Sequence, residues 1–266
     1  MRKIKDTAAE YHENGAINRS SLFLMSKSPA HFKHSLENKE ETEALRFGKL
    51  FHTFILEPEC LDDRYVEVDI DRRTKEGKTT ALQIAESGRE TVSTVELASL
   101  NEMKKSIFAN KYASALLRGE KEISYYWQDE MTGIECKCRP DCITPIGELN
   151  IIVDLKSCDN ASTEEFMRAA LRYGYDLQSA QYKTGVELVE QKPHKFVFIA
   201  VEKKPPYALN ILEADEIFIR KGYDDFRTYL GMLKYCRETD NWYSYTGETG
   251  RPNVLNLPAW LIKEYE

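Results

Sequence analysis

The sequence predicts a single α/β domain over residues 1–266, with a helical region at its N-terminal end. Apolar residues recur at helical spacing before about residue 120. Short runs rich in β-branched and aromatic residues begin at Glu122 and then alternate with helical segments. No repeat, low-complexity tract or linker-like stretch divides the chain, so one domain is expected.

The composition is that of an ordinary globular protein, with 42% apolar and 30% charged residues. No apolar run approaches the roughly 18 residues of a membrane span, and the first fifteen residues lack the apolar segment of a signal peptide. Six cysteines without such a signal indicate reduced thiols, so we expect a cytoplasmic protein. The net charge of −7 argues against nucleic-acid binding through bulk charge, but it allows a local basic channel.

Three helical segments precede the strands. Residues 18–36 are interrupted at Ser28, before a proline, and residues 41–58 end at Pro58. Residues 93–117 predict one long helix that opens with a serine followed three residues later by glutamate, which is a capping-box pattern. Residues 69–80 are polar and lack periodicity, so an exposed loop is expected there.

The second half predicts strands and helices in alternation. The expected strands are 122–128 and 133–143, forming a hairpin, then 148–157, 194–203 and 207–215. The expected helices are 162–190, interrupted near Gly174, and 215–240, and the tail after them is irregular and aromatic.

An acidic hairpin carries the first chemical signal. A turn centred at residues 147–148 would set Asp141 opposite Asp154 and Arg139 opposite Lys156. Two carboxylates on one sheet face repel each other unless a cation lies between them, and Mg²⁺ is a suitable cation. Lys156 shares a face with Asp154 and could orient or deprotonate a water. A solvated strand face with a surface ion pair is the alternative.

Three further polar residues follow helical spacing. Gln178 and Tyr182 lie at i, i+4 on one face of a predicted helix. His52 lies on an upstream helix, and Gly48 one turn earlier would allow close approach of another group. A packed or surface histidine and a chance Gln/Tyr pair are the alternatives.

In this order, the residues resemble the RecB-type branch of the PD-(D/E)XK nucleases, and more closely the nuclease domain of RecE, exonuclease VIII. The matching pieces span nearly the whole chain: "EYH", "SPAHF", "FGKLFHTFILEP", "DRRTKEGK", "YYWQDEMTGIECKCRPD", "IIVDLKS", "DLQSAQY", "FVFIAVE" and "LPAWLIKEY". The resemblance implies a PD-(D/E)XK core in which helices flank a central mixed β-sheet.

The resemblance also implies an activity. Such enzymes are Mg²⁺-dependent, ATP-independent 5′→3′ exonucleases on linear double-stranded DNA, and Mn²⁺ can replace Mg²⁺. They start at DNA ends and leave 3′ single-stranded tails for a RecT-like annealing protein. A ring-shaped homo-oligomer, with a tetramer favoured, and a phage- or prophage-encoded protein in a bacterial cytoplasm are implied as well. The sequence contains no G-x-x-x-x-G-K-[ST] phosphate loop, which agrees with independence from ATP.

The resemblance assigns a role to each matching residue. Asp141 and Asp154 are implied to bind metal, Leu155 to offer its backbone carbonyl as a further ligand, and Lys156 to be the catalytic lysine. The remaining implied residues are His52 at the metal site, Gln178 and Tyr182 contacting DNA or ordering the site, and Glu122 where relatives often carry an acidic residue.

Two other clusters are open to more than one interpretation. The basic stretch "DRRTKEGK" is either a solvated loop or a DNA-phosphate contact made by Arg72, Arg73, Lys75 and Lys78, and we expect the contact. The second cluster is Cys136, Cys138, Cys142 and Cys158, which could hold an iron–sulfur cluster or be structural thiols. The spacing is not that of a C-x₂-C knuckle, so thiols are favoured, with the first three packed on the sheet face opposite Asp141.

Two other functions remain open. A DNA-binding module of the same fold could have lost catalysis, although all polar residues of the motif are present. An endonuclease or a single-strand nuclease of the same superfamily would carry the same motif.

Overall fold

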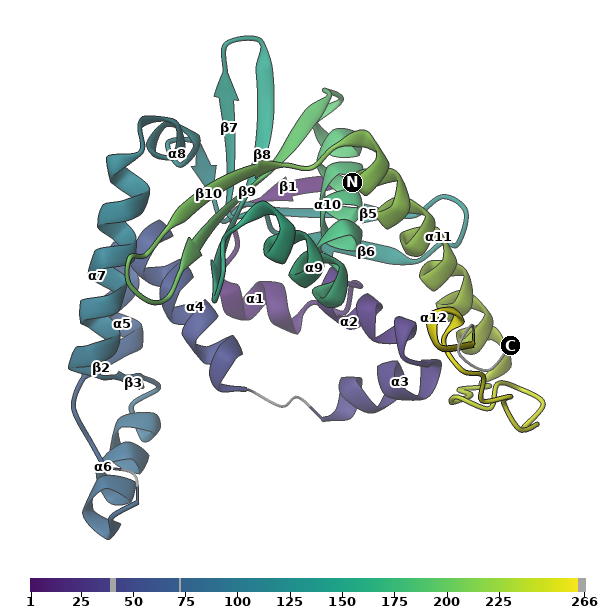
Figure 1. Ribbon diagram of the computed structural model, residues 1–266, viewed down its shortest axis with the longest axis horizontal. Coiled ribbons are helices and arrows are strands. Elements are labelled where there is room, and N and C mark those ends of the chain that lie inside the picture. The colour runs from purple at the N-terminus through teal and green to yellow at the C-terminus, as the bar shows by residue number, and fades with distance from the viewer. Residues whose placement is uncertain (39–41, 72, 263–266) are drawn as a thin grey trace.

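A computed structural model describes residues 1–38, 42–71 and 73–262 (Figure 1). The strands are β1 (Arg2–Ile4), β2 (Tyr65–Glu67), β3 (Glu90–Val92), β4 (Glu120–Lys121), β5 (Ser124–Gln128), β6 (Glu135–Cys138), β7 (Cys142–Ile146), β8 (Leu149–Cys158), β9 (His194–Glu202) and β10 (Leu209–Glu213). The α-helices are α1 (Ala8–Glu13), α2 (Arg19–Phe23), α3 (Pro29–Glu37), α4 (Glu43–Leu56), α5 (Leu61–Arg64), α6 (Lys75–Glu86), α7 (Thr94–Ala109), α8 (Lys111–Leu116), α9 (Thr163–Tyr173), α10 (Tyr175–Glu190), α11 (Glu216–Thr239) and α12 (Ala259–Ile262). Two 3₁₀ turns, η1 (Leu24–Ser26) and η2 (Pro58–Cys60), lie between helices.

A mixed sheet forms the centre of the described structure, with the strand order β10-β9-β8-β7-β4. Strands β8 and β9 run parallel, and the other neighbours are antiparallel. A smaller sheet has the order β1-β5-β6, and β2 pairs with β3 in parallel. The α/β fold with a central mixed sheet flanked by helices is therefore confirmed.

Side chains alternate along β8 and β9, so the two faces of the central sheet enter two separate apolar cores. Ile152 and Phe196 lie in the core that packs against α10 and α11. Ile151 and Val153 point to the other face, into the core formed with α4 and α7. This arrangement places α4 and α10, which carry polar residues predicted for the site, on opposite faces of β8 (Figure 1).

The hairpin register predicted from the turn is correct where β7 and β8 pair. Cys142 lies opposite Val153, and the ladder continues to the turn. The ladder ends at Cys142, however, because the chain crosses between the two sheets at residues 139–141. Pro140 also has no N–H to donate to a ladder. Arg139 therefore does not face Lys156, and the predicted strand 133–143 is divided into β6 and β7.

One loop prediction and one helix prediction were wrong for identifiable reasons. Residues 69–80 were expected to be a loop, but Thr74 caps α6, accepting a hydrogen bond from Gly77 N at 3.0 Å. Gly77 is the only buried residue of α6, so the helix has no apolar stripe to reveal it. The long helix at 93–117 has the predicted capping box but breaks at Asn110, whose side chain caps α8.

The predicted break near Gly174 is confirmed. Gly174 has a φ of +68° between α9 and α10 and adopts the left-handed conformation that glycine accepts most readily. The strands β1, β2, β3 and β4 were not predicted; each has only two or three residues, which is too short for an alternating pattern. No helix within the described ranges is long and apolar enough to cross a membrane.

Helix α11 supplies a matched test of this packing. A Cβ added to Gly222 would lie 1.9 Å from the backbone oxygen of Asp176, whereas one added to Gly231 would meet nothing within 4 Å. We expect Gly222→Ala to lower the free energy of unfolding by about 1–3 kcal/mol because backbone must shift. Gly231→Ala should raise it by up to about 1 kcal/mol through helix propensity. Urea unfolding of both variants measures this, and equal effects would contradict the close packing of α11 on α10.

Candidate active site

Asp141 lies at the centre of the candidate site, immediately before β7, and its side chain is buried. Its Oδ2 accepts a hydrogen bond from the backbone N–H of Leu155 at 2.6 Å. Its Oδ1 lies 3.2 Å from Nδ1 of His52. The carboxylate is thus held from β8 on one side and from α4 on the other.

His52 reaches Asp141 because α4 buries its neighbours on the sheet. Leu50 and Phe51 lie in the core beneath the sheet, so the next position of the helix faces its margin. Burial alone would lower the pKa of His52, but attraction to the Asp141 carboxylate outweighs it and raises the pKa from 6.5 to about 9. The same pairing lowers the pKa of Asp141 against the opposing effect of burial.

Glu122 is the third titratable side chain near His52 and Asp141. It follows β4 and has a φ of +54°, a left-handed conformation that costs a non-glycine residue about 1–2 kcal/mol. Its backbone N–H donates to the backbone oxygen of Asp141 at 3.3 Å. Burial, and then repulsion by Asp141, raise the pKa of Glu122 to about 7.

These three side chains suit a metal ion. One ligand atom from each of His52, Glu122 and Asp141 lies within 4.8 Å of the others. A nitrogen and two carboxylate oxygens are donors that Mg²⁺ or Mn²⁺ accept. Burial and the neighbouring Asp141 carboxylate disfavour the charged form of Glu122 and raise its pKa, and a divalent cation would favour that charged form. The residues therefore fit a cation.

Asp154 and Lys156 form a second pair on the adjoining part of β8. They lie two residues apart on one face of the strand, and the Lys156 ammonium forms an ion pair with the buried Asp154 carboxylate. The ammonium also lies 4.7 Å from the ring centre of Tyr175. Burial and the charge of Asp141 raise the pKa of Asp154 although Lys156 opposes them. Asp154 lies outside the three-residue group that could hold a metal.

Gln178 connects this pair to the N-terminal region. Its amide nitrogen donates to Asp154, and its oxygen accepts from a guanidinium nitrogen of Arg19 at 2.9 Å. Tyr182, one turn later, is a partly buried neighbour whose pKa is raised by burial. The structure thus brings the predicted Gln178 to the site. Sequence reasoning missed Arg19, because no spacing relates a residue near the N-terminus to α10.

A cavity of about 210 Å³ opens beside Glu122. Its lining is rich in hydrogen-bond donors from α1, α2 and its N-cap, α10 and the strand crossing: His12, Asn18, Arg19, Ser20, Arg139 and Tyr182, with Ala8, Tyr11 and Glu122. A larger cavity of about 630 Å³ lies around β2, β3 and the start of α4, and none of the three metal-group residues lines it. The smaller cavity is the one that adjoins the site chemistry.

The predicted DNA-contacting residues lie elsewhere. Arg72 is outside the described residues. Arg73 is 91% exposed and pairs with Asp71 at 2.9 Å, while Lys75 and Lys78 are exposed on α6. Figure 1 shows α6 projecting from the body of the molecule, away from the central sheet. The structure does not bring this basic segment to the metal group within one chain.

The cysteines do not form a cluster. Cys136 and Cys138 lie in the core under α10, whereas Cys142 lies in the core on the other face of the central sheet. The expectation that these three share one face was wrong, because the first two belong to the smaller sheet. All six cysteines of the chain are free thiols, and burial raises the pKa of Cys136 to about 12. These findings favour structural thiols.

The comparisons with known proteins agree with this geometry. Residues 19–250 match the family model described as "PDDEXK-like domain of unknown function (DUF3799)". The chain belongs to this family. No curated protein matches it. Among solved structures, it resembles a protein from Eubacterium rectale named "Putative exonuclease", with a TM-score of 0.66, 16% sequence identity and 98% of each chain covered. A structure named SSO0001 shares 14% identity over 69% of this chain and 86% of that one, with a TM-score of 0.31.

Membership in the PDDEXK-like family, together with the fold, places the chain in the PD-(D/E)XK nuclease superfamily. Asp141 immediately precedes β7, and Asp154 and Lys156 lie on β8. Within this PDDEXK-like chain, the β7–β8 pairing positions the acidic residues and α4 adds the histidine.

The protonation of the group predicts how stability depends on pH. His52 and Glu122 both have folded-state pKa values above their ordinary ones, so the folded metal-free protein binds more protons than the unfolded chain. The contribution of these groups to the free energy of unfolding is then fully present below about pH 4.5. It falls as Glu122 loses its proton, with a pKa of about 7, and as His52 loses its proton, with a pKa of about 9. We expect the unfolding free-energy difference between wild type and His52→Gln/Glu122→Gln to decrease steadily from pH 5 to pH 9 in EDTA.

Chemical denaturation at several pH values measures this difference. His34→Gln is the control, because this exposed histidine of α3 contacts Asn38 rather than a carboxylate group. With saturating Mg²⁺ the free energy of unfolding of the wild type should instead increase with pH, since metal binding requires the deprotonated ligands. A difference that grows with pH in EDTA would contradict the assigned protonation.

Proposed function

We propose that the protein is a Mg²⁺-dependent, ATP-independent 5′→3′ exonuclease acting on the ends of linear double-stranded DNA. The observation that carries the proposal is the convergence of His52, Glu122 and Asp141 next to the Asp154–Lys156 pair. The proposal also includes binding at DNA ends, production of 3′ tails for a RecT-like annealing protein, a ring-shaped oligomer such as a tetramer, and a role in a bacterial cytoplasm. They rest on the likeness of the sequence to RecE.

Phosphodiester hydrolysis needs a positioned water and neutralisation of charge at the scissile phosphate. A divalent cation held by His52, Glu122 and Asp141 would supply Lewis-acid charge there. The ammonium of Lys156 would orient the attacking water and offset the charge that builds on the phosphate oxygens. Gln178 fixes Asp154, and through it the position of that ammonium.

Support for an exonuclease, rather than another nuclease, comes from the whole chain. The RecE-like segments run from the N-terminal "EYH" to the tail, and the structure with a TM-score of 0.66 carries an exonuclease name. The donor-rich cavity beside Glu122 also offers a place for a terminal nucleotide, with Arg19 available to its phosphate. An endonuclease, a single-strand nuclease or a silent DNA-binding module would share the fold but need not act from an end.

Lys156→Ala tests the catalytic assignment. We expect the rate of digestion of a linear duplex to fall by at least about 100-fold, because the variant loses the group that positions water and offsets charge. Lys195→Ala on the adjacent strand β9, where Lys195 pairs with Glu213 on the surface, is the matched control and should retain activity. The measurement is release of label from either 5′ end with Mg²⁺ or EDTA, after circular dichroism has confirmed folding of both variants.

Early release of 5′ label as mononucleotides, only from linear DNA and only with Mg²⁺, would support the exonuclease. Nicking of a circular duplex would retain the metal site and replace the exonuclease by an endonuclease. A shifted DNA band without cleavage in wild type would indicate a binding module and overturn the catalytic role of Lys156.

We expect DNA to pass along the exposed face of α4. Gly48 lies one helical turn before His52, and a Cβ added there would meet nothing within 4 Å, so packing within the chain does not require glycine. We expect Gly48→Ala to raise the unfolding free energy by up to about 1 kcal/mol and to raise KM for linear duplex, because the methyl group would meet the DNA backbone. Gly231→Ala should stabilise α11 and leave KM unchanged. A more stable Gly48→Ala protein with unchanged KM would show that DNA does not approach α4 there.

A further inference from the structure

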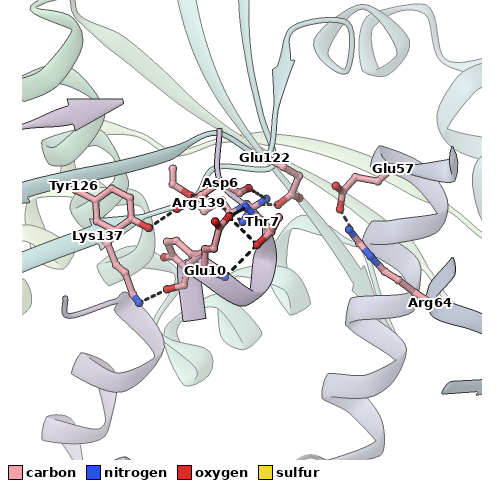
Figure 2. Close-up of polar contacts among 11 residues, drawn as sticks. Asp6, Thr7, Glu10, Glu57, Arg64, Glu122, Tyr126, Lys137 and Arg139 are labelled. Atoms are coloured by element: carbon pink, nitrogen blue, oxygen red, sulfur yellow. Dashed lines mark hydrogen bonds and ion pairs between the residues drawn. The ribbon is translucent and has the colours of Figure 1, made fainter. Parts of the chain in front are cut away.

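Arg139 lies at the strand crossing between β6 and β7 and connects two acidic residues. Its side chain is about 10% exposed. Its Nε lies 2.9 Å from a carboxylate oxygen of Glu122. On its other side, one terminal nitrogen lies 3.6 Å from a carboxylate oxygen of Asp6 and the other donates to the backbone oxygen of Asp6 at 3.1 Å. Figure 2 shows the guanidinium between the two residues.

Asp6 is itself fixed by the smaller sheet. Its carboxylate accepts hydrogen bonds from Ser124 Oγ and Tyr126 OH, both at 2.5 Å. Strand β1 brings it there by pairing antiparallel with β5, with Ile4 opposite Ser124. Thr7 then begins α1 through a capping box (Figure 2). The N-terminal segment therefore presents a fixed carboxylate to Arg139.

The same segment is tied down a second time beyond α1. Lys137 of β6 is 2% exposed, and its ammonium donates to the backbone oxygen of Asn14 at 2.6 Å and to that of Tyr11. Both ends of α1 are thus attached to the sheet that carries Arg139. Movement of this segment would alter the position of the Arg139 side chain.

Glu122 needs such support more than the other two members of the metal group. It belongs to neither β4 nor β5, has a left-handed backbone, and its partly buried carboxylate lies near that of Asp141. Like charges this close drive apart side chains that nothing holds. The contact between Arg139 and Glu122 is an ion pair, and a guanidinium with several nitrogens can meet Glu122 and Asp6 at once where a compact ammonium cannot.

We propose that Arg139 is a positioning residue that, together with Asp6, holds the Glu122 carboxylate toward His52 and Asp141. The N-terminal segment of the chain is thereby part of the metal site. This inference rests on the proposed function, since it assigns a partner to a ligand of the same cation. It assigns no contact between Arg139 and the substrate.

Direct Mn²⁺ binding, followed by the electron paramagnetic resonance signal of free Mn²⁺, separates positioning from folding. We expect Arg139→Lys and Asp6→Asn to bind Mn²⁺ at least about tenfold more weakly than wild type, as is typical when a ligand loses the outer partner that orients it. Glu122→Gln should lose at least as much affinity. Arg139→Lys/Glu122→Gln should bind as Glu122→Gln does, because the lysine substitution removes an interaction that is already absent.

Arg227→Lys is the matched control. Arg227 forms an ion pair with the buried Asp129 and ties α11 to the β5–β6 turn, so the variant loses a comparable guanidinium contact away from the metal group. It should bind Mn²⁺ as wild type does, even if its unfolding free energy falls. In cleavage assays, excess Mn²⁺ should restore the rate of Arg139→Lys.

The outcomes distinguish this inference from the proposed function. Wild-type Mn²⁺ affinity in Arg139→Lys, or additive losses in the double variant, would overturn the role of Arg139 while leaving the nuclease intact. Wild-type protein that neither binds Mn²⁺ nor cleaves DNA would overturn the proposed function itself. Weakened Mn²⁺ binding in Arg227→Lys as well would show a general loss of structure and overturn the positioning role.

Discussion

Mutual repulsion of buried carboxylates is the constraint on which the site depends. Asp141 and Asp154 are fully or almost fully buried, and Glu122 adds a third negative charge beside them. In a medium that screens poorly, such a group is tolerated only if each charge has a cationic or hydrogen-bonding partner. The structure supplies one cationic partner to each carboxylate. His52 pairs with Asp141, Lys156 pairs with Asp154, and Arg139 pairs with Glu122.

Each cation comes from a different part of the chain, and this explains why so much of the fold serves the site. Helix α4 delivers His52 because its apolar face packs on one side of the central sheet. Strand β8 carries Lys156 two residues from its partner, while α10 on the opposite face contributes Gln178. The β6–β7 crossing, supported by the N-terminal segment, carries Arg139. Loss of either apolar core would therefore separate charges that stabilise one another.

The sequence patterns correctly predicted those features that depend on residues close together in the chain. The turn at residues 147–148 predicted the β7–β8 register, and helical spacing placed Gln178 correctly on α10. Contacts between distant segments were out of reach: Asp6 meets Arg139 across more than a hundred residues, and Arg19 meets Gln178 across a similar separation. The start of α6 was missed because a single threonine cap, rather than an apolar stripe, determines it.

The charge balance indicates how a cation and a phosphate could be accommodated together. With a pKa of about 9, His52 is protonated at neutral pH, so a proton occupies the group in the metal-free protein. A divalent cation would displace this proton and the partial proton of Glu122, whose pKa is about 7, so the group would gain less than one net positive charge. Lys156 and Arg139 would keep their carboxylate partners, since neither is needed as a ligand. The added charge would then be available to an incoming phosphodiester, which is the requirement for hydrolysis without a nucleotide cofactor.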